Sequence, residues 1–353
     1  MTEEVNTTGW DAIEESLTKL YGEQEPKHYG TAISYMLGGP DPLDGLSAYK
    51  AETPSPHWHI VTFGFSELYE KELENIEYSG YGFELSFRVT HSQEEEEPPA
   101  WALNLLQNMG RYVFNSNNIF ASGDYLDANG PICLGADTQL TALAFIPDPE
   151  LDTLHTPNGR VEFLQMVGIT EDELEAMKVW NTRGVLEAGK AEIPGYITDL
   201  SRNCMLQVPA IQESVQIGID RDGSNTGYLF VDQLAWEPGK NGLFKKKPAV
   251  FTLGAKQAST VGKLLRGRLL KGKDLMLVSE GLSVTLEHAS TTELETGEGT
   301  VHLKLDEAVV NELIHKLLPK EGEIRMSSSK DLMIQVVKTY IKDQDGNVTS
   351  TIG

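Results

Sequence analysis

Two side chains that commonly bind metal ions recur at strand spacing. His57 and His59 stand two residues apart in PHWHIVTFGF, residues 56–65. In a strand, residues i and i+2 point to the same face, so both imidazoles could bind one ion. A zinc site needs three or four ligands, and the spacing of the other histidines supplies no convincing third one. The pattern leaves two interpretations open: half of a metal site, or a hydrogen-bonded pair in a protein core.

Two other segments resemble ligand-binding loops but depart from the required spacing. GRLLKGKD, residues 267–274, has the frame of a phosphate-binding loop but carries Asp274 where magnesium chemistry needs Ser or Thr. IDRDGSN, residues 219–225, resembles a calcium loop, yet with Asp220 as position one the sixth and twelfth positions are Asn225 and Val231, where Gly and Glu are required. We predict a strand and a turn for the first segment. For the second we predict a tight turn between domains, with a weak calcium site as the alternative.

The remaining sequence contains no motif of a catalytic nucleophile or of a dinucleotide site. Cys133 and Cys204 have neither metal-type spacing nor a partner pattern that predicts a disulfide framework. We therefore predict no catalytic residue, no metal and no cofactor, and a binding protein rather than an enzyme. The alternative is an enzyme of unknown reaction whose site is not recognisable from the sequence.

Charge is distributed unevenly along the 353 residues, whose formal net charge is −24. Residues 1–225 contain 12 Lys and Arg against 37 Asp and Glu, whereas residues 226–353 contain 17 against 16. Between Lys240 and Lys273 there are ten basic residues and no acidic one. The acidic first part argues against nucleic acid as a partner, because phosphates would be repelled. The basic stretch could meet an acidic peptide or the acidic part of its own chain.

The sequence also carries signals of compartment. It has no apolar run of the roughly 18 residues that a membrane-spanning helix needs. Its first residues, MTEEVNTTGW, lack the basic and apolar regions of a signal peptide. We expect no membrane association and a cytoplasmic location.

Helical and strand patterns are mixed without regular alternation, which favours the α+β class. Apolar spacing and capping residues predict helices at 10–21, 101–114, 171–180 and 307–318. We predict strands at 56–65, 81–89 (half-buried), 226–236, 249–253, 263–270, 274–278, 282–288, 300–305 and 332–341, with a mobile tail at 342–353. The shift in charge and the turn DGSNTG, residues 222–227, divide the chain into domains at 1–225 and 226–353.

Several long blocks, in this order, resemble the Suppressor of fused family. The blocks are LGGPDPLD (37–44), HWHIVTFGFSELY (57–69), GYGFELSFR (80–88), RYVFNSNNIFASGD (111–124), TPNGRVEFLQMVGIT (156–170), DGSN (222–225) and LRGRLLKG (265–272). The resemblance extends from about residue 17 to residue 320. Because the histidine pair falls inside a block of a non-enzymatic family, the resemblance favours its structural interpretation.

The resemblance implies two mixed α/β domains with a cleft between them, where a partner's extended segment is clamped as an added strand. Animal members sequester Gli-type transcription factors in this way. In such a mode, backbone pairing supplies affinity and side-chain pockets supply specificity. The peptide-binding residues that the resemblance implies here are Tyr112 and Asp124 in the first domain, and Tyr228, Leu229, Phe230 and Val231 in the second.

Two arginines complete the predicted site. Arg266 and Arg268 would alternate on the strand predicted at 263–270, so both would point to one face. If that face lined the cleft, they could meet Asp124 or the acidic groups of a peptide.

The chain departs from animal members in the second domain. Residues 237–248 stand in place of a long insertion, and Lys256 and Gln257 stand where an acidic contact is expected. The compact form is typical of bacterial members, many of which are thought to act as immunity proteins. The predicted partner is another protein or a peptide, with a toxin among the candidates, because an acidic surface attracts basic toxins. The sequence leaves immunity or regulation, the oligomeric state and an open or closed domain arrangement undecided.

Overall fold

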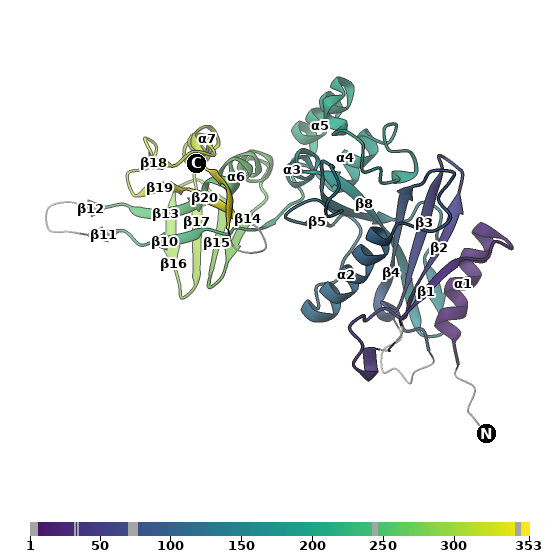
Figure 1. Cartoon of the computed structure of the whole chain (residues 1–353). Helices are drawn as coiled ribbons and strands as arrows, with labels where there is room; N and C mark the ends of the chain where they lie inside the picture. Colours follow the sequence, from purple (N-terminus) through teal and green to yellow (C-terminus); the bar gives the residue numbers. More distant parts are fainter. Residues whose placement is uncertain (1–5, 32, 34, 70–76, 242–245, 343–346) are drawn as a thin grey trace. The chain divides into compact units, whose positions relative to one another are not determined.

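The computed structural model describes residues 6–31, 33, 35–69, 77–241, 246–342 and 347–353. Contacts divide the chain into two compact units (Figure 1). Unit 1 consists of Met1–Leu174 and Val185–Gln212, and unit 2 of Glu175–Gly184 and Glu213–Gly353. Helices and strands are mixed in both units, which confirms the predicted α+β class.

The division by contacts differs from the predicted boundary at residue 225, because Glu213 and the residues after it belong to unit 2. The indole of Trp180 explains the assignment. Its N–H donates to Asp222 at 3.0 Å, and its ring lies so close to Gly218 that a Cβ there would come within 2.2 Å of it. By this division unit 1 contains 9 Lys and Arg against 33 Asp and Glu, and unit 2 contains 20 of each.

Unit 1 is built on an eight-stranded sheet in the order β1-β2-β3-β4-β8-β6-β5, with β7 pairing with β8. Its strands are β1 Lys27–Gly30, β2 Gly45–Ala51, β3 His57–Phe63, β4 Tyr78–Thr90, β5 Tyr125–Asp127, β6 Leu140–Pro147, β7 Leu154–Thr156 and β8 Gly159–Thr170. Its helices are α1 Thr8–Tyr21 and α2 Ala100–Ser116, with short 3-10 turns at Tyr35–Leu37, Pro194–Tyr196 and Met205–Gln207. The helices α3 Glu171–Val179, α4 Thr182–Ala188 and α5 Pro209–Asp222 cross the division between the units.

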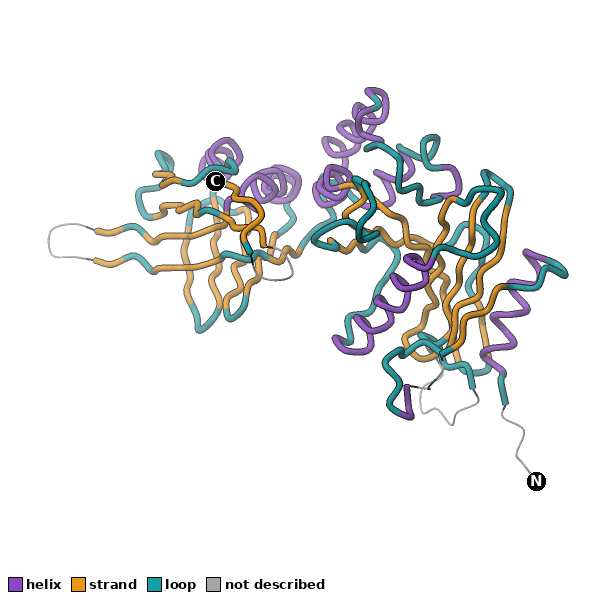
Figure 2. The backbone as a smooth tube through the Cα atoms, in the orientation of Figure 1, coloured by secondary structure: helices purple, strands orange, loops and turns teal. Residues whose placement is uncertain are grey.

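Helices cover both faces of this sheet (Figure 2). Helix α2 packs on the face that carries Trp58 and Ile60, and α1 packs on the face that carries Val61 and Phe63. Strand β3 is consequently buried at every position. The prediction that 81–89 is half-buried is wrong for the same reason. Its residues alternate as predicted, but the polar side, which includes Arg88, is buried as well.

Unit 2 contains a five-stranded sheet in the order β16-β17-β15-β14-β9 and a four-stranded sheet in the order β10-β13-β19-β18. The strands are β9 Tyr228–Phe230, β10 Leu234–Glu237, β13 Ala249–Gly254, β14 Leu275–Ser279, β15 Leu282–His288, β16 Glu293–Thr296, β17 Thr300–Leu305, β18 Gly322–Arg325 and β19 Leu332–Val337. Two short ribbons, β11 Lys240–Asn241 with β12 Lys246–Lys247 and β20 Thr339–Lys342 with β21 Val348–Ile352, complete the strands. Helices α6 Ala255–Arg268 and α7 Glu307–Lys316 pack against one core shared with both larger sheets.

Several sequence predictions fail in unit 2. The strands predicted at 226–236 and 332–341 are each divided between two sheets, as β9 and β10 and as β19 and β20. Residues 263–268 belong to helix α6, followed by a 3-10 turn at Leu269–Lys271, and not to a strand. The buried Leu264 and Leu265 face the common core from one side of this helix. A short apolar run is compatible with either structure, so spacing alone could not decide. The tail predicted to be mobile forms strand β21, paired with β20, while residues 343–346 lie outside the described residues.

Within the described part of the chain, no helix combines the length and apolar character needed to cross a membrane.

Candidate binding site on an open strand edge

Strand β9 lies at the end of the five-stranded sheet and pairs only with β14 among the described residues. The pairing is parallel, with Tyr228 opposite Met276 and Phe230 opposite Val278. Such an end strand leaves one row of backbone N–H and C=O groups available to another strand. The four residues predicted to pair with a peptide, 228–231, therefore lie on an open edge or directly after it.

The hydrogen bonds show which backbone groups face that edge. Gly227 accepts from the N–H of Met276 at 2.9 Å, and Val231 donates to Val278 at 2.8 Å. Because neighbouring residues of a strand direct their backbone groups to opposite sides, Tyr228 and Phe230 direct theirs to the open edge. Their N–H and C=O groups are those that an added strand would bind.

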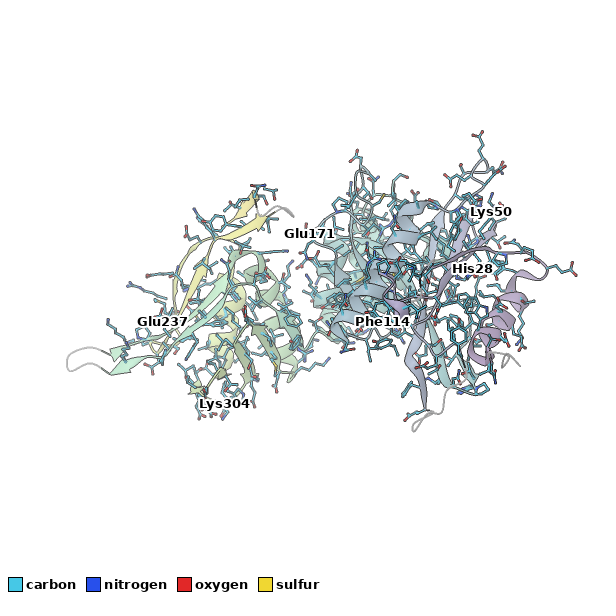
Figure 3. The ribbon with its side chains drawn as sticks, turned by 60° about the horizontal axis from the view of Figure 1, so that its bottom comes forward. His28, Lys50, Phe114, Glu171, Glu237 and Lys304 are labelled. Atoms are coloured by element: carbon cyan, nitrogen blue, oxygen red, sulfur yellow. The ribbon has the colours of Figure 1, made fainter. Side chains whose placement is uncertain are left out.

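The side chains of the same two residues form an exposed apolar patch. Tyr228 is 46% exposed and Phe230 is 71% exposed, and their rings pack edge to face with centroids 4.8 Å apart. Met276, opposite Tyr228 on β14, is 39% exposed. The intervening Leu229 is buried in the core, as is Val231. Towards β16 the open face becomes charged, where Lys304 (labelled in Figure 3) pairs with Glu295 at 2.7 Å.

The loop before β9 is fixed by hydrogen bonds. Ser224 donates its N–H to Gly267 at 3.0 Å and its hydroxyl to Lys178 at 2.6 Å. Gly223 has φ of +66°, and a Cβ there would lie 2.1 Å from the carbonyl oxygen of Gly267. Glycine is thus required in DGSN for a left-handed backbone and for close packing. The segment is a structural connector, and Asp222 at its start ends helix α5 instead of beginning a turn.

Arg268 contributes to the same support. Its guanidinium donates to the carbonyl oxygens of Asp274 at 2.7 Å and Ser224 at 2.9 Å. Arg266 is 69% exposed and lies 3.8 Å from Asp220. The prediction that the two arginines share one face is wrong, because residues two apart on a helix are separated by about 200°. Contact of either arginine with a peptide stays a prediction.

In unit 1, Tyr112 and Asp124 lie beside one aromatic stack. The ring of Tyr112 stacks on Phe120, which in turn stacks on Phe145 with centroids 4.1 Å apart. Asp124 is exposed, and its backbone carbonyl accepts from the N–H of Phe145 at 2.9 Å. Its carboxylate accepts from the N–H of Ala121 at 2.8 Å. The structure thus brings together the two residues that sequence reasoning assigned to this domain, next to the end strand β5.

An acidic residue next to β9 was missed by sequence reasoning. Asp232 is exposed and accepts from the side-chain amide of Gln257 at 2.9 Å. Gln257 is one of the two residues that stand where the resemblance implies an acidic contact. Through this hydrogen bond it holds the Asp232 carboxylate, two residues after the end of β9. The sequence shows this aspartate in VDQ, residues 231–233, but only the fold places Gln257 beside it.

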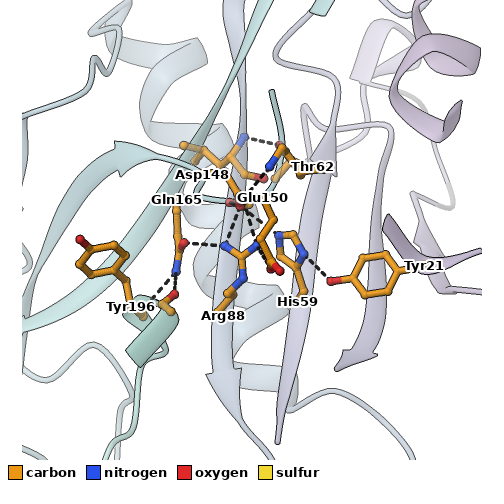
Figure 4. Close-up of polar contacts among 12 residues, drawn as sticks. Tyr21, His59, Thr62, Arg88, Asp148, Glu150, Gln165 and Tyr196 are labelled. Atoms are coloured by element: carbon orange, nitrogen blue, oxygen red, sulfur yellow. Dashed lines mark hydrogen bonds and ion pairs between the residues drawn. The ribbon is translucent and has the colours of Figure 1, made fainter. Parts of the chain in front are cut away.

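His59 belongs to a buried polar network in unit 1 (Figure 4), whereas Nδ1 of His57 lies 2.7 Å from the backbone carbonyl oxygen of Ser55. Nδ1 of His59 lies 2.6 Å from the hydroxyl of Tyr21, and Nε2 lies 3.2 Å from Asp148. Asp148 also accepts two hydrogen bonds from Arg88, at 2.7 and 2.9 Å. Arg88 donates further to Glu150 at 2.9 Å and to Gln165 at 2.5 Å. Both nitrogens of His59 are therefore engaged within the chain.

Burial and charge set the protonation of this network. Burial lowers the pKa of His59, and the Arg88 guanidinium lowers it further. Burial also lowers the pKa of His57 to about 4. For Asp148, burial alone would raise the pKa, but His59 and Arg88 together hold it well below its usual range. The result is a neutral histidine pair beside a buried Arg88–Asp148 ion pair.

A second buried carboxylate, Glu84, lies on β4, the strand that carries Arg88, and forms no ion pair with a described residue. It accepts hydrogen bonds from the hydroxyls of Thr62 and Ser66, each at 2.6 Å, and from the backbone N–H of Gly64 and Ser66 at 3.0 and 2.9 Å. Burial raises the pKa of Glu84 to about 7, although these hydrogen bonds oppose the shift. The residue fixes the turn after β3.

Among the described residues, no group of three His, Cys, Asp or Glu side chains is arranged to hold a metal ion. The structure therefore offers no third ligand to His57 and His59, and the absence of a bound metal in the purified protein stays a prediction.

These features define a two-unit α+β protein with an open, aromatic strand edge. Comparisons with known proteins agree with the resemblance. The model of the Suppressor of fused protein (SUFU) family matches residues 39–203. The Suppressor of fused homologs of Homo sapiens and Mus musculus are each 37% identical to this chain, over 246 and 247 residues. These alignments cover 65% of this chain and 50% of each relative, so the chain spans about half the length of the curated relatives it matches.

Solved structures show the same fold. The crystal structure of Drosophila Suppressor of Fused matches with a TM-score of 0.78 and 23% identity, over 95% of this chain and 99% of that one. A chain from a crystal structure described as the Sufu-Fu complex matches with a TM-score of 0.56 and 32% identity, over 60% of this chain and 98% of that one. The protein belongs to the Suppressor of fused family.

Proposed function

We propose that this protein binds another protein by accepting an extended segment as an added strand on the open edge of β9. The observation that carries the proposal is the geometry of Tyr228 and Phe230. Their backbone groups face an edge without a described partner strand, and their rings are exposed beside it. Added strands obtain affinity from backbone hydrogen bonds and specificity from side-chain contacts.

Relatives support a protein partner. A Suppressor of fused protein has been crystallised in the complex described as Sufu-Fu. In the mode that the family resemblance implies, both units contact one segment, and Tyr112 and Asp124 are the contributions we propose for unit 1. Their common position beside the Phe120–Phe145 stack supports a shared role.

The charge of unit 1 supports a basic partner. With 9 basic against 33 acidic residues, unit 1 would attract a positively charged protein and speed its association. This is the surface expected of a cytoplasmic immunity protein that neutralises a basic toxin, or of a regulator with a basic target. We propose the first of these roles for this compact member.

We propose that binding is not accompanied by catalysis. Strongly perturbed ionisable groups often mark active sites. In unit 1, however, the two buried carboxyl groups with strongly shifted pKa values, Glu84 and Asp148, are hydrogen-bonded to the chain itself. Burial and hydrogen bonding explain the shifted pKa values of these two carboxyl groups, and neither group offers an exposed surface to a substrate.

Two substitutions at one position test the proposal. Phe230→Ala removes the exposed ring but keeps the backbone N–H, whereas Phe230→Pro removes both and spares the bonds of Gly227 and Val231 to β14. The wild type and both variants are immobilised and exposed to a lysate of the source cells, and retained proteins are identified by mass spectrometry. The affinity of each purified candidate is then measured.

Strand addition predicts that Phe230→Ala weakens partner binding and that Phe230→Pro weakens it further, by about tenfold or more beyond the alanine variant. Equal affinities of the two variants would mean that the backbone edge is not used. Lys263→Ala, a change at an exposed position of α6, is the control for a nonspecific effect.

A further inference from the structure

The outer face of the four-stranded sheet in unit 2 contains a groove of about 800 Å³. Its floor is apolar. Val250 on β13 and Met333 on β19 are cross-strand neighbours there, and Pro238 and Pro248 line it as well. Glu237, labelled in Figure 3, lies at the end of β10 and forms part of the wall.

The rim of the groove is predominantly basic. It contains the exposed residues Lys240, Lys247, Arg325 and Lys330, against two acidic residues, Glu237 and Glu323. Arg325 lies 3.6 Å from Glu323. The three lysines form no ion pair with any described residue. Because unit 2 as a whole contains 20 basic and 20 acidic residues, four basic against two acidic residues at this rim is a local excess of positive charge.

We propose that this groove is a second binding site, for an acidic peptide segment of another protein. An apolar side chain of the segment would pack on Val250 and Met333, while its carboxylates would pair with Lys240, Lys247 and Lys330. Charge complementarity of this kind provides attraction and orientation, and burial of the apolar side chain adds affinity. Lys240 and Lys247 belong to the basic stretch that the sequence shows between Lys240 and Lys273.

The chemistry of the groove favours a peptide over other anions. A simple anion would leave the floor of Val250, Met333 and the two prolines uncovered. A single-stranded nucleic acid is usually held by aromatic side chains that stack on its bases, and none of the described residues that line the groove is aromatic. The groove lies on a different sheet from β9, so the proposal does not depend on strand addition there.

The test uses the full-length protein and a short fluorescein-labelled peptide of alternating Glu and Leu, followed by fluorescence anisotropy. The double variant Lys247→Glu/Lys330→Glu should weaken binding by about tenfold or more. The pair Lys263→Glu/Lys320→Glu makes the same change of charge at exposed positions of unit 2 outside the groove. It should change the affinity by less than about twofold. Met333→Ala should weaken binding severalfold, and Phe230→Pro should leave it unchanged.

Four results would overturn the proposal. The first is a wild type that does not bind the peptide, and the second is equal weakening of binding by both double variants. The third is a peptide of alternating Lys and Leu that binds as well as the acidic one. The fourth is displacement of the peptide by inorganic phosphate or a short single-stranded DNA at equal concentration, which would indicate a site for phosphates. Circular dichroism of each variant verifies that it is folded.

Discussion

At the scale of residues, the chemistry of His57 and His59 is decided by their neighbours. Their spacing correctly predicts that they share a face of a strand, but the same pattern fits a metal site and a core. Helix α1 covers the histidines, and the ion pair of Arg88 with Asp148 lies beside them, which decides for the core. Neither the helix nor the ion pair is adjacent to the histidines in sequence. The alternation of 81–89 was likewise predictable. The burial of Glu84 and Arg88 was not, because it depends on which elements cover the sheet.

The Arg88–Asp148 pair yields the first prediction. Arg88→Met leaves Asp148 buried without its cation and should lower the free energy of unfolding by about 3–5 kcal/mol. Urea denaturation of the wild type and the variant measures it. Arg160→Met, at a partly exposed pair with Glu162, is the matched control and should cost at most about 1 kcal/mol. A loss for Arg88→Met no larger than that of the control would show that the network does not support unit 1.

Glu84 and the histidines make opposite contributions to the pH dependence of stability. The folded pKa of Glu84 is about 7 against an ordinary 4.5, so folding binds a proton and this contribution is lost as pH rises between these values. The folded pKa of His57 is about 4 against 6.5, so its contribution is present above 6.5 and is lost as pH falls. The two partly cancel in the wild type between the ordinary pKa values of the two groups.

Glu84→Gln should separate these contributions. The variant removes the ionisation while its amide oxygen can still accept from Gly64 and Ser66. Its free energy of unfolding, relative to the wild type, should increase steadily from about pH 5 to about pH 7. Urea denaturation at intervals across that range provides the measurement, with the exposed Glu94→Gln as control. A difference that is constant with pH would contradict the assignment.

At the scale of elements, capping residues were more informative than apolar runs. Thr170 and Glu173 exchange the hydrogen bonds of a capping box before α3, as the sequence indicates. The carboxylate of Asp306 accepts from two N–H groups of α7. The run at 263–270 was mistaken for a strand because it has no such signal. Its leucines pack from a helix, which changes the place of both arginines.

The revised position of Arg268 leads to an element-scale prediction. Because Arg268 links Ser224 to Asp274, Arg268→Met should loosen the loop before β9 and speed amide hydrogen exchange in residues 224–231 severalfold. Arg266→Met makes the same chemical change two residues away, where the side chain is exposed. Exchange measured by mass spectrometry should be unchanged in this control. Identical exchange in both variants would mean that Arg268 does not brace β9.

At the scale of the whole molecule, the sequence predicts one acidic part and one near-neutral part, but it does not predict the topology within them. The position of β9 at the end of a sheet follows from its parallel pairing with β14, almost fifty residues later in the chain, and no local pattern encodes that pairing. The composition alone shows the uneven charge of the two parts. The boundary between the units differs from the predicted one, because Trp180 packs against α5.

The charge of unit 1 predicts a salt-sensitive interaction. If the partner is basic, raising the salt concentration from about 50 mM to about 500 mM should slow association by about tenfold or more, because exposed charges are screened. Surface plasmon resonance at both concentrations measures the association rate of the captured partner. A rate independent of salt would show that the acidic surface does not guide binding.

The most direct test of strand addition is the exchange of individual amide protons at β9, followed by NMR with and without the captured partner. The N–H groups of Tyr228 and Phe230 face the open edge, and bound partner should slow their exchange by about tenfold or more. Val231, whose N–H already donates to Val278, should change much less and serves as the internal reference. A partner that binds while the exchange of Tyr228 and Phe230 stays as fast as in the free protein would contradict strand addition at β9.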